Sequence, residues 1–250
     1  MIHSFLLIGQ SNMAGRGFLH EAKDVDTTHI KILRNGRWQR MFRPVNNDRH
    51  FSGVCLGESF AERYAKEFET DVGLICCADG GTSLEQWKKG SILFDNAVYQ
   101  AKLAQRTSVI SGILWHQGEA DCAPELCATY KVRFEKFAND LREALNLYDV
   151  PLLIGGLGEF LKDCELDELL VNYDKLNDEF KKIAAENDYM GYVSAEGLGA
   201  NPDNLHFNAE SLYEFGIRYY EEFLKFKPVS SGYQDKAVEN DSERTFMENL

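Results

Sequence analysis

Short apolar runs alternate along the chain with longer amphipathic stretches, and this alternation is the feature that most constrains the fold. The apolar runs are rich in Ile, Leu and Val and show little polar alternation, which is typical of strands covered on both faces of a sheet. The sequence therefore predicts strands over residues 2–8, 72–78, 109–116, 151–155 and 190–194.

The stretches between these runs show helical periodicity, with large apolar side chains recurring every three or four residues. Asn208 precedes the last of these stretches and is of a type that favours the N-cap position. Strands that alternate with helices indicate an α/β fold, in which about five parallel strands lie between two layers of helices. Helices are predicted over residues 56–68, 93–105, 130–145, 169–183 and 212–223.

In such folds the active site lies at the carboxyl ends of the strands, so functional residues are expected directly after the apolar runs. Residues 14–53 have a weak pattern and are expected to form a long excursion over the top of the sheet. The chain has 250 residues, the size of one large domain. We assign a single domain to residues 1–227 and expect the polar segment 228–250 to be a frayed or disordered tail.

The net charge of the chain limits the classes of partner that it is expected to bind. The chain has 27 Lys and Arg against 40 Asp and Glu, which gives a formal net charge of −13. Such a chain repels nucleic acids and anionic membranes, so neither is expected as a partner. No run approaches the roughly 20 apolar residues of a membrane helix, and the first residues lack the basic region of a signal peptide. We therefore expect a cytoplasmic protein whose six cysteines are mostly reduced and buried.

The first functional candidate follows the first predicted strand, in the run Gly-Gln-Ser-Asn-Met-Ala-Gly-Arg-Gly over residues 9–17. A serine at the tip of a parallel strand projects toward the cleft, near free backbone N–H groups that favour developing negative charge. Ser11 is therefore a candidate nucleophile, with an ordinary Gly/Ser turn as the alternative. The run is not the G-x-S-x-G motif of α/β-hydrolases.

Paired glycines follow the second predicted strand, in the run Asp-Gly-Gly-Thr over residues 79–82. Glycines at a strand end can turn a backbone N–H toward a ligand, which makes Gly80 and Gly81 candidate ligand contacts. A phosphate loop is disfavoured because no Lys stands in the Walker position. A simple tight turn is the other alternative.

The third predicted strand ends in Trp-His-Gln-Gly-Glu-Ala-Asp over residues 115–121. A neutral amide such as Gln117 can donate to an oxyanion without a change of charge. His116 is either a cleft residue or an ordinary hydrogen-bonded histidine at a strand end. A metal site of His116, Glu119, Asp121 and Cys122 is an alternative, but the spacing matches no standard zinc or calcium pattern. We expect neither a metal nor a cofactor.

The fourth candidate lies before the last predicted helix, where Asp203 stands three residues ahead of His206. A carboxylate at this spacing can reach Nδ1 of the imidazole, fix its tautomer and leave Nε2 facing the cleft. Asp-x-x-His is common by chance, but here it follows a strand-tip serine in the order Ser, Asp, His.

Together these segments resemble the SGNH (GDSL-like) hydrolase superfamily, and most closely its sialate O-acetylesterase/carbohydrate esterase family 6 branch, which includes acetylxylan esterases. The resemblance implies a flavodoxin-like three-layer fold and metal-free ester hydrolysis. It also implies that Ser11 is the nucleophile and that His206 is the general base. Asp203 looks like the residue that orients His206, with Glu119 as the alternative. The matching segments are 9–17, 80–87, 115–121 and 203–207.

The resemblance further implies an oxyanion hole made by the Ser11 N–H, an N–H of Gly80 or Gly81, and the Gln117 amide. Most members of the superfamily have Asn where this branch has Gln, so the longer side chain must be positioned differently. The residues expected to bind substrate are Gln10, Asn12, Arg16, Trp87 and His116.

The expected function is that of a serine esterase that removes O-acetyl groups from carbohydrates, such as acetylated xylo-oligosaccharides, through an acetyl-enzyme. The enzymatic alternatives are a sialate O-acetylesterase or another SGNH acyl-ester or thioester hydrolase. The non-enzymatic alternative is a carbohydrate-binding protein on a degenerate hydrolase fold. Trp38, Trp87 and Trp115 are candidate sugar-stacking platforms, with a place in the core as the alternative.

Overall fold

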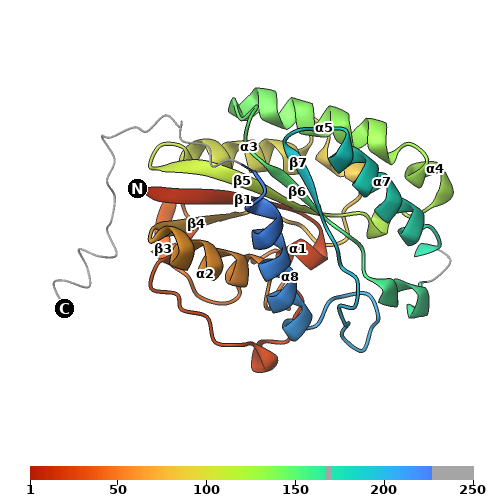
Figure 1. The fold of residues 1–250 in the computed structure, drawn as a ribbon, viewed down its shortest axis with the longest axis horizontal. Helices are drawn as coiled ribbons and strands as arrows, with labels where there is room; N and C mark the ends of the chain where they lie inside the picture. Colours follow the sequence, from red (N-terminus) through yellow and green to blue (C-terminus); the bar gives the residue numbers. More distant parts are fainter. Residues whose placement is uncertain (167–169, 227–250) are drawn as a thin grey trace.

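One seven-stranded sheet organises the molecule, with strands in the order β3-β2-β4-β1-β5-β6-β7 (Figure 1). The structure is a computed structural model that describes residues 1–166 and 170–226. Neighbouring strands are parallel except for β2 and β3, which form an antiparallel pair. The strands are β1 (Ile2–Gly9), β2 (Ile30–Arg34), β3 (Arg37–Arg40), β4 (Asp71–Cys76), β5 (Ser108–His116), β6 (Leu152–Gly155) and β7 (Met190–Val193).

All the predicted strands are present, with ends that differ from the prediction by one or two residues. The sheet nevertheless has more strands than expected, because the weakly patterned segment 14–53 contributes the hairpin of β2 and β3. Its turn is formed by Asn35, with φ 52°, and Gly36, with φ 74°. Positive φ at both central positions is typical of the Asn-Gly turn of a two-residue hairpin. This dipeptide was the signal for the additional strands.

Helices cover both faces of the sheet, as predicted for a three-layer α/β fold (Figure 1). The predicted helix over 169–183 begins later, at Tyr173, and residue 169 lies outside the described part of the chain. The helices are α1 (Ser11–Ala14), α2 (Gly57–Phe68), α3 (Ile92–Ala104), α4 (Pro124–Cys127), α5 (Tyr130–Leu145), α7 (Tyr173–Ala185) and α8 (Ala209–Phe223), with short 3-10 helices at η1 (Leu19–Glu21), η2 (Leu84–Trp87), η3 (Glu119–Asp121) and η4 (Glu159–Asp163).

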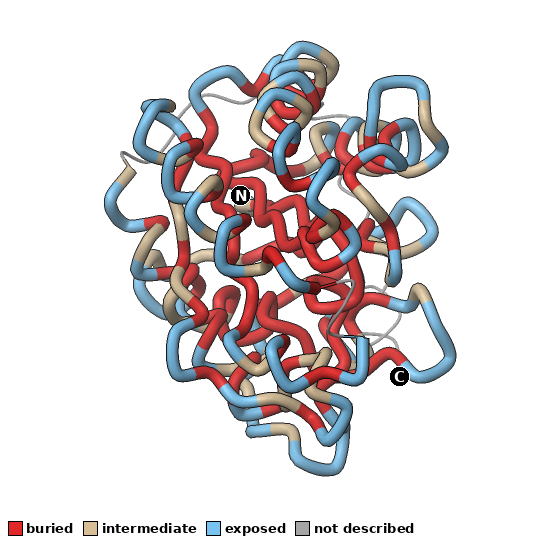
Figure 2. Tube along the Cα trace, turned by 90° about the vertical axis from the view of Figure 1, so that its right-hand side faces the viewer, coloured by how far each residue is buried: buried red, intermediate tan, exposed pale blue. Residues whose placement is uncertain are grey.

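Two hydrophobic cores fill the spaces between the layers. Helices α3, α5 and α7 pack on one face of the sheet, whereas α2 and α8 pack on the other. Side chains of β1 alternate between the cores, since Leu6 and Ile8 belong to the first and Phe5 and Leu7 to the second. Figure 2 shows buried residues through the centre of the molecule and exposed segments around them.

The end of β7 and the start of α8 bound the loop that carries the predicted Asp203 and His206. Helix α8 begins directly after Asn208, whose side-chain oxygen accepts a hydrogen bond from the Ser211 N–H. The predicted N-cap is thereby confirmed, and the cap holds the end of the loop at the carboxyl edge of the sheet.

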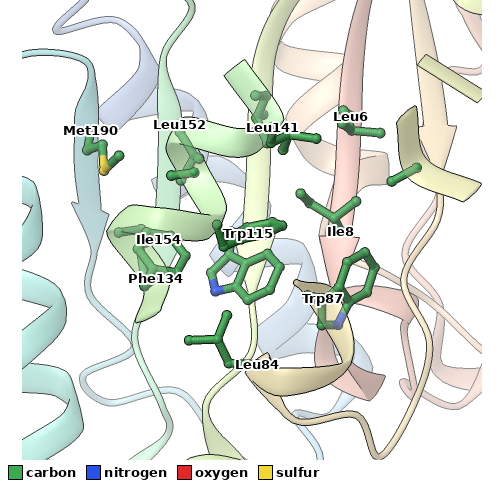
Figure 3. Close-up of a cluster of buried hydrophobic side chains, with 14 of the residues drawn as sticks. Leu6, Ile8, Leu84, Trp87, Trp115, Phe134, Leu141, Leu152, Ile154 and Met190 are labelled. Atoms are coloured by element: carbon green, nitrogen blue, oxygen red, sulfur yellow. The ribbon is translucent and has the colours of Figure 1, made fainter. Parts of the chain in front are cut away.

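Two of the three tryptophans belong to the core. Trp87 and Trp115 are fully buried, and their rings meet edge to face with centroids 5.6 Å apart (Figure 3). The indole N–H groups donate to Thr82 and to Tyr130 respectively. The prediction that Trp87 binds substrate is therefore wrong, because its ring fills the space between η2 and the sheet. Trp38 is half-buried on β3.

All six cysteines are free, and all but the half-buried Cys76 are buried. Burial raises the pKa of the Cys77 thiol to about 12, so this side chain stays protonated at neutral pH. Among residues 1–166 and 170–226, no helix has the length and apolar character needed to span a membrane. The predicted tail, 228–250, lies outside the described residues.

Candidate active site

Ser11 stands where β1 ends and α1 begins, at the carboxyl edge of the sheet. The chain turns at Gly9, whose φ is +131° and where a Cβ atom would lie 2.0 Å from the carbonyl oxygen of His116. The Gln10 N–H donates to the same carbonyl oxygen over 2.9 Å. Only glycine fits this close approach of β1 to β5, which directs the next residues over the strand ends.

Three of the predicted residues, Ser11, His206 and Asp203, lie within hydrogen-bonding distance of one another in that order. Nε2 of His206 lies 3.0 Å from Oγ of Ser11, and Nδ1 lies 2.7 Å from Oδ2 of Asp203. The other carboxylate oxygen of Asp203 accepts the backbone N–H groups of Leu205 and His206, each over 3.0 Å. Residues separated by 195 positions in the chain therefore meet within hydrogen-bonding distance.

Asp203 is suited to holding a proton on the imidazole. Burial by itself would raise the pKa of the Asp203 carboxyl, but the hydrogen bonds from the His206 ring and from two backbone N–H groups outweigh it and lower the pKa. An ionised carboxylate accepts only, so it requires the proton on Nδ1. Nε2 is then an acceptor that faces the Ser11 hydroxyl, which is the arrangement needed to remove a hydroxyl proton.

Asn12 links the segment of Ser11 to the segment of His206. Its Nδ2 donates to Oε1 of Glu119 over 2.6 Å and to the carbonyl oxygen of Leu205 over 3.2 Å. Its Oδ1 accepts the Phe207 N–H over 3.1 Å. The side chain is buried and its polar atoms are engaged within the protein, so the prediction that Asn12 binds substrate is wrong.

Glu119, the alternative partner of the histidine, is not on His206. It is buried on η3, where Oε1 accepts the Asn12 amide and lies 3.8 Å from Nδ1 of His116. Its Oε2 has no hydrogen-bond partner among the described residues. The position on Nδ1 of His206 belongs to Asp203.

His116 lies inside the protein and does not face the cleft. It is completely buried, with Nε2 3.1 Å from the carbonyl oxygen of Gly156 and its ring edge-on to Phe207 and Phe215. Burial lowers the pKa of the imidazole, although Glu119 acts in the opposite direction. The prediction that His116 binds substrate is therefore wrong, and its interpretation as a hydrogen-bonded strand-end histidine is confirmed.

Gln117 also points inward, away from any substrate. It is completely buried, and Nε2 donates to Oδ2 of Asp121 over 2.7 Å and to the carbonyl oxygen of Thr82 over 3.1 Å. Oε1 accepts the Tyr130 hydroxyl over 3.0 Å. A flipped amide would place oxygen against two acceptors, so this orientation is required. The prediction of Gln117 as an oxyanion donor is wrong, because both of its N–H groups hold the neighbouring loop.

Asp121 also holds the segment of Thr82 and Leu84, which the Gln117 amide contacts. Besides the Gln117 amide, Oδ2 accepts the Leu84 N–H over 2.7 Å, and Oδ1 accepts Nη2 of Arg133 over 2.8 Å. The carboxylate is completely buried. Asp121 therefore connects β5, the start of η2 and the surface of α5.

The paired glycines lie beside Ser11. The Gly80 N–H donates to Oδ2 of Asp48 over 2.9 Å, and a Cβ atom at Gly80 would lie 3.5 Å from Cβ of Ser11. Gly81 has φ +77° and faces open space, since nothing lies within 4 Å of where its Cβ would be. The N–H of Gly80 is thus already engaged, which leaves Gly81 as the candidate donor of the pair.

Asp48 was not predicted from the sequence to belong to the site. Its side chain is buried with that of Arg16, and their charged atoms lie 2.6 Å apart. Burial would raise the pKa of Asp48, but hydrogen bonds from Arg16, Ser52 and the Gly80 N–H together lower it. Arg16 thus supports the glycine turn through Asp48. Asp48 lies in the weakly patterned segment, where no motif marked it.

Gln10 is buried as well, and its Oε1 accepts the Ala120 N–H at 3.5 Å. Of the residues predicted to bind substrate, Gln10 and Arg16 therefore lie beneath the site and contact the protein itself. Within the described ranges, no group of three or more His, Cys, Asp or Glu side chains has the arrangement of a metal site.

Comparison with known proteins places the chain in a family. Residues 1–225 match the family model described as "Carbohydrate esterase, sialic acid-specific acetylesterase". The chain is 28% identical over 249 residues to the "Probable carbohydrate esterase At4g34215" of Arabidopsis thaliana, covering 88% of this chain and 89% of that protein.

Solved structures show the same fold. The structure of the Arabidopsis thaliana protein AT4G34215 superposes with a TM-score of 0.77 at 26% identity, covering 89% of this chain and 98% of that one. NanS superposes with a TM-score of 0.69 at 16% identity, covering 90% and 97%. Because the family model matches nearly the whole chain, the protein belongs to the carbohydrate esterase family of sialic acid-specific acetylesterases.

Proposed function

We propose that the protein is a serine carbohydrate O-acetylesterase that deacetylates short xylo-oligosaccharides through an acetyl-enzyme. The observation that carries the proposal is the continuous hydrogen-bonded line from Asp203 through His206 to Ser11. A hydroxyl, an imidazole and a carboxylate in this order form the arrangement that turns serine into a nucleophile. Family membership supports a carbohydrate ester as the substrate.

In the proposed first step, Nε2 of His206 takes the hydroxyl proton of Ser11 as Oγ bonds to the acetyl carbonyl carbon. The carbonyl electron pair moves to oxygen and forms a tetrahedral oxyanion. When the oxyanion collapses, the bond to the sugar oxygen breaks, and that oxygen leaves with the proton from His206. Water then attacks the acetyl-enzyme in the same way, which releases acetate and restores Ser11.

We assign the oxyanion to the backbone N–H groups of Ser11 and Gly81. The Gly80 N–H is engaged by Asp48, and the Gln117 amide is engaged by Thr82 and Asp121. A backbone donor of this kind typically lowers the barrier by about 2.7–4 kcal/mol.

A neutral sugar is favoured by the charges around Ser11. Arg16 is paired with Asp48, and Arg49 is paired with Asp79, so the positive charges on both sides of the glycine turn are compensated. The protein as a whole carries a formal charge of −13, which suits a neutral substrate better than an anionic one.

We propose the cytoplasm as the location of the protein, and cell fractionation tests this proposal.

The decisive experiment compares wild-type protein with Ser11→Ala on p-nitrophenyl acetate and on acetylated xylo-oligosaccharides. We expect acetate release by the wild type and a loss of about 10⁴-fold or more in the variant, since the nucleophile is removed. A fluorophosphonate should label Ser11 in the wild type. Undiminished activity of the variant would falsify the mechanism, and a wild type that binds sugars but is neither labelled nor active would be a carbohydrate-binding protein.

The second candidate is a sialate O-acetylesterase, which the description of the matching family model favours. The two candidates share the same acyl transfer and differ in the charge of the sugar. Rates on O-acetylated sialic acid and on acetylated xylo-oligosaccharides of equal concentration separate them. We expect the larger kcat/KM on the neutral substrate.

A further inference from the structure

We propose that a cavity lined by Asp48 and Asp79, next to the glycine turn at Gly80, is a subsite for the sugar ring adjacent to the acetylated one; this inference rests on the proposed function. The cavity has a volume of about 500 Å³ and opens at the carboxyl ends of β2 and β4, between the segment 45–48 and α3. Small-molecule sites in proteins usually have volumes of about 300–1,000 Å³. The space is therefore large enough for a pyranose ring.

The cavity is linked to the reacting serine through two residues, Asp48 and Gly80. Asp48 lines the cavity, and its carboxylate accepts the N–H of Gly80, which stands next to Ser11. Strand β4 is the direct neighbour of β1 in the sheet. In this proposal, a substrate whose acetyl group lies at Ser11 extends past the glycine turn to the cavity wall at Asp48 and Asp79.

The chemistry of the walls fits a ring with hydroxyl groups. Asn47 and Asn96 are exposed at the cavity, and their side chains have no hydrogen bond to another described residue. An amide both donates and accepts, as binding of a hydroxyl requires. Leu33, Val45 and Leu93 supply apolar surface for the C–H faces of a sugar.

The charged groups of the cavity are already paired or engaged. Asp48 is paired with Arg16, and Asp79 with Arg49. Nη2 of Arg34 donates to the backbone carbonyl groups of residues 44 and 45. Because the groups left to a ligand are chiefly neutral amides, the ligand class that fits is a neutral carbohydrate.

The test is the dependence of kcat/KM on chain length. For the wild type, we expect a larger kcat/KM on acetylated xylotriose than on acetylated xylose. Asn96→Trp places a bulky ring in the cavity and should lower the ratio of the xylotriose value to the p-nitrophenyl acetate value about tenfold, as expected when one or two hydrogen bonds are lost. Lys102→Trp, an exposed site further along α3 that does not line the cavity, should leave the ratio unchanged.

Binding of unacetylated xylotriose, measured by calorimetry, separates this inference from the proposed function. Wild-type binding that Asn96→Trp abolishes supports the subsite even in a protein without esterase activity. The inference is overturned if the wild type shows no preference for the longer substrate, or if Asn96→Trp and Lys102→Trp behave alike in both measurements.

A different observation carries a second inference. We infer that Asn12 is a positioning residue that sets the distance between Ser11 and His206. Asn12 follows Ser11 directly, and its amide is bonded to the backbone groups of Leu205 and Phe207, on either side of His206. The Asn12 side chain therefore links the backbone beside Ser11 to the backbone on both sides of His206, the two residues that form the Nε2–Oγ contact.

Glu119 holds the Asn12 amide from its other side. A backbone N–H can only donate, so the Phe207 N–H fixes Oδ1 of Asn12 and directs Nδ2 toward Glu119, whose Oε1 lies 2.6 Å away. The buried carboxylate thus acts through Asn12 and not on the histidine, which gives Glu119 a role in the site without contact to substrate.

Asn12→Ala should slow turnover of p-nitrophenyl acetate about a hundredfold, with KM within about threefold of wild type, because a small displacement of a catalytic group has this effect. Glu119→Ala should show the same split to a smaller degree, and Glu119→Gln, which still offers an acceptor, should restore most of kcat. The rate of fluorophosphonate labelling of Ser11 should follow kcat. Variants that melt at lower temperature but keep wild-type kcat and labelling rates would overturn the inference.

Discussion

Asp203 and Asp121 are two carboxylates at the same edge of the sheet, but they differ in exposure and in the groups that they bind. The side chain of Asp203 is 47% exposed, and its partners are His206 and two N–H groups of its own loop. The side chain of Asp121 is 0% exposed and joins Gln117, the Leu84 N–H and Arg133. The first faces the reacting serine through an imidazole, whereas the second holds a loop from inside the protein.

The two carboxylates differ in whether water can reach their hydrogen-bond partners once the carboxylate is removed. Water reaches the partners of Asp203, so loss of that carboxylate should affect the imidazole more than the fold. The partners of Asp121 include a buried amide and a largely buried guanidinium, and these would lose their acceptor without gaining water. The exposed carboxylate is therefore expected to matter for rate and the buried one for stability.

The largest expected effect is that of His206→Ala on the exposed side of this comparison. Without the imidazole nothing accepts the Ser11 proton, so turnover of p-nitrophenyl acetate should slow about 10⁴–10⁶-fold. The melting temperature, followed by circular dichroism, should stay close to that of the wild type. Activity within tenfold of wild type would contradict the role of His206.

Asp203→Asn should have the next largest effect. The amide can donate to Nδ1 and so favour the wrong tautomer, which should slow turnover about 10²–10⁴-fold. Glu119→Gln is the matched control, because that residue lies beside the site but not on His206. If Glu119→Gln lowered kcat as much as Asp203→Asn, the assignment of the two carboxylates would have to be reversed.

Asp121→Ala should lower the free energy of unfolding by about 3 kcal/mol, the typical result of removing one partner of a buried charge pair. Gln117→Ala should cost about 1–3 kcal/mol, because it leaves buried groups without a partner. Urea unfolding measures both. If Gln117→Ala kept wild-type stability but turned over substrate at least a hundredfold more slowly, Gln117 would be restored as an oxyanion donor.

The smallest expected effect is on the pH dependence of stability. The pKa of Asp203 is lowered from its ordinary value of 3.8, so its stabilising contribution is fully present above that value and is lost as pH falls through the lowered pKa. Solvent screens this half-exposed group, and the contribution should be small. Urea unfolding of wild type and Asp203→Asn at about pH 3 and about pH 6 should give a difference that shrinks at the lower pH. A difference that grows there would contradict the lowered pKa.

Much of the fold could be predicted because it depends on local patterns. Continuous apolar runs indicated the parallel strands, and Asn208 indicated the start of α8. The hairpin of β2 and β3 was missed because both strands are short and β3, at the edge of the sheet, is partly exposed, although Asn35 and Gly36 marked the turn. Strands this short carry little apolar periodicity, so the signal lay in the turn.

The candidate site was predicted in part for the same reason. Asp203 and His206 are three residues apart, and their contact follows from one loop. Asp48 was not predicted, because its partners Arg16 and Gly80 are each 32 residues away in the chain. No local pattern reports a contact of that kind.

The sequence by itself determined that Ser11 follows a buried parallel strand and that a carboxylate stands within reach of His206. Only the tertiary structure decided which way the polar side chains at and after the end of β5 point. Gln117 and His116 turn inward, and Glu119 meets Asn12 and not His206. The physical reason is that a polar side chain at a strand end forms its hydrogen bonds with the segment that the tertiary fold packs against it, and that segment can lie far away in the sequence. For Gln117 that partner is Thr82, which lies 35 residues earlier in the chain.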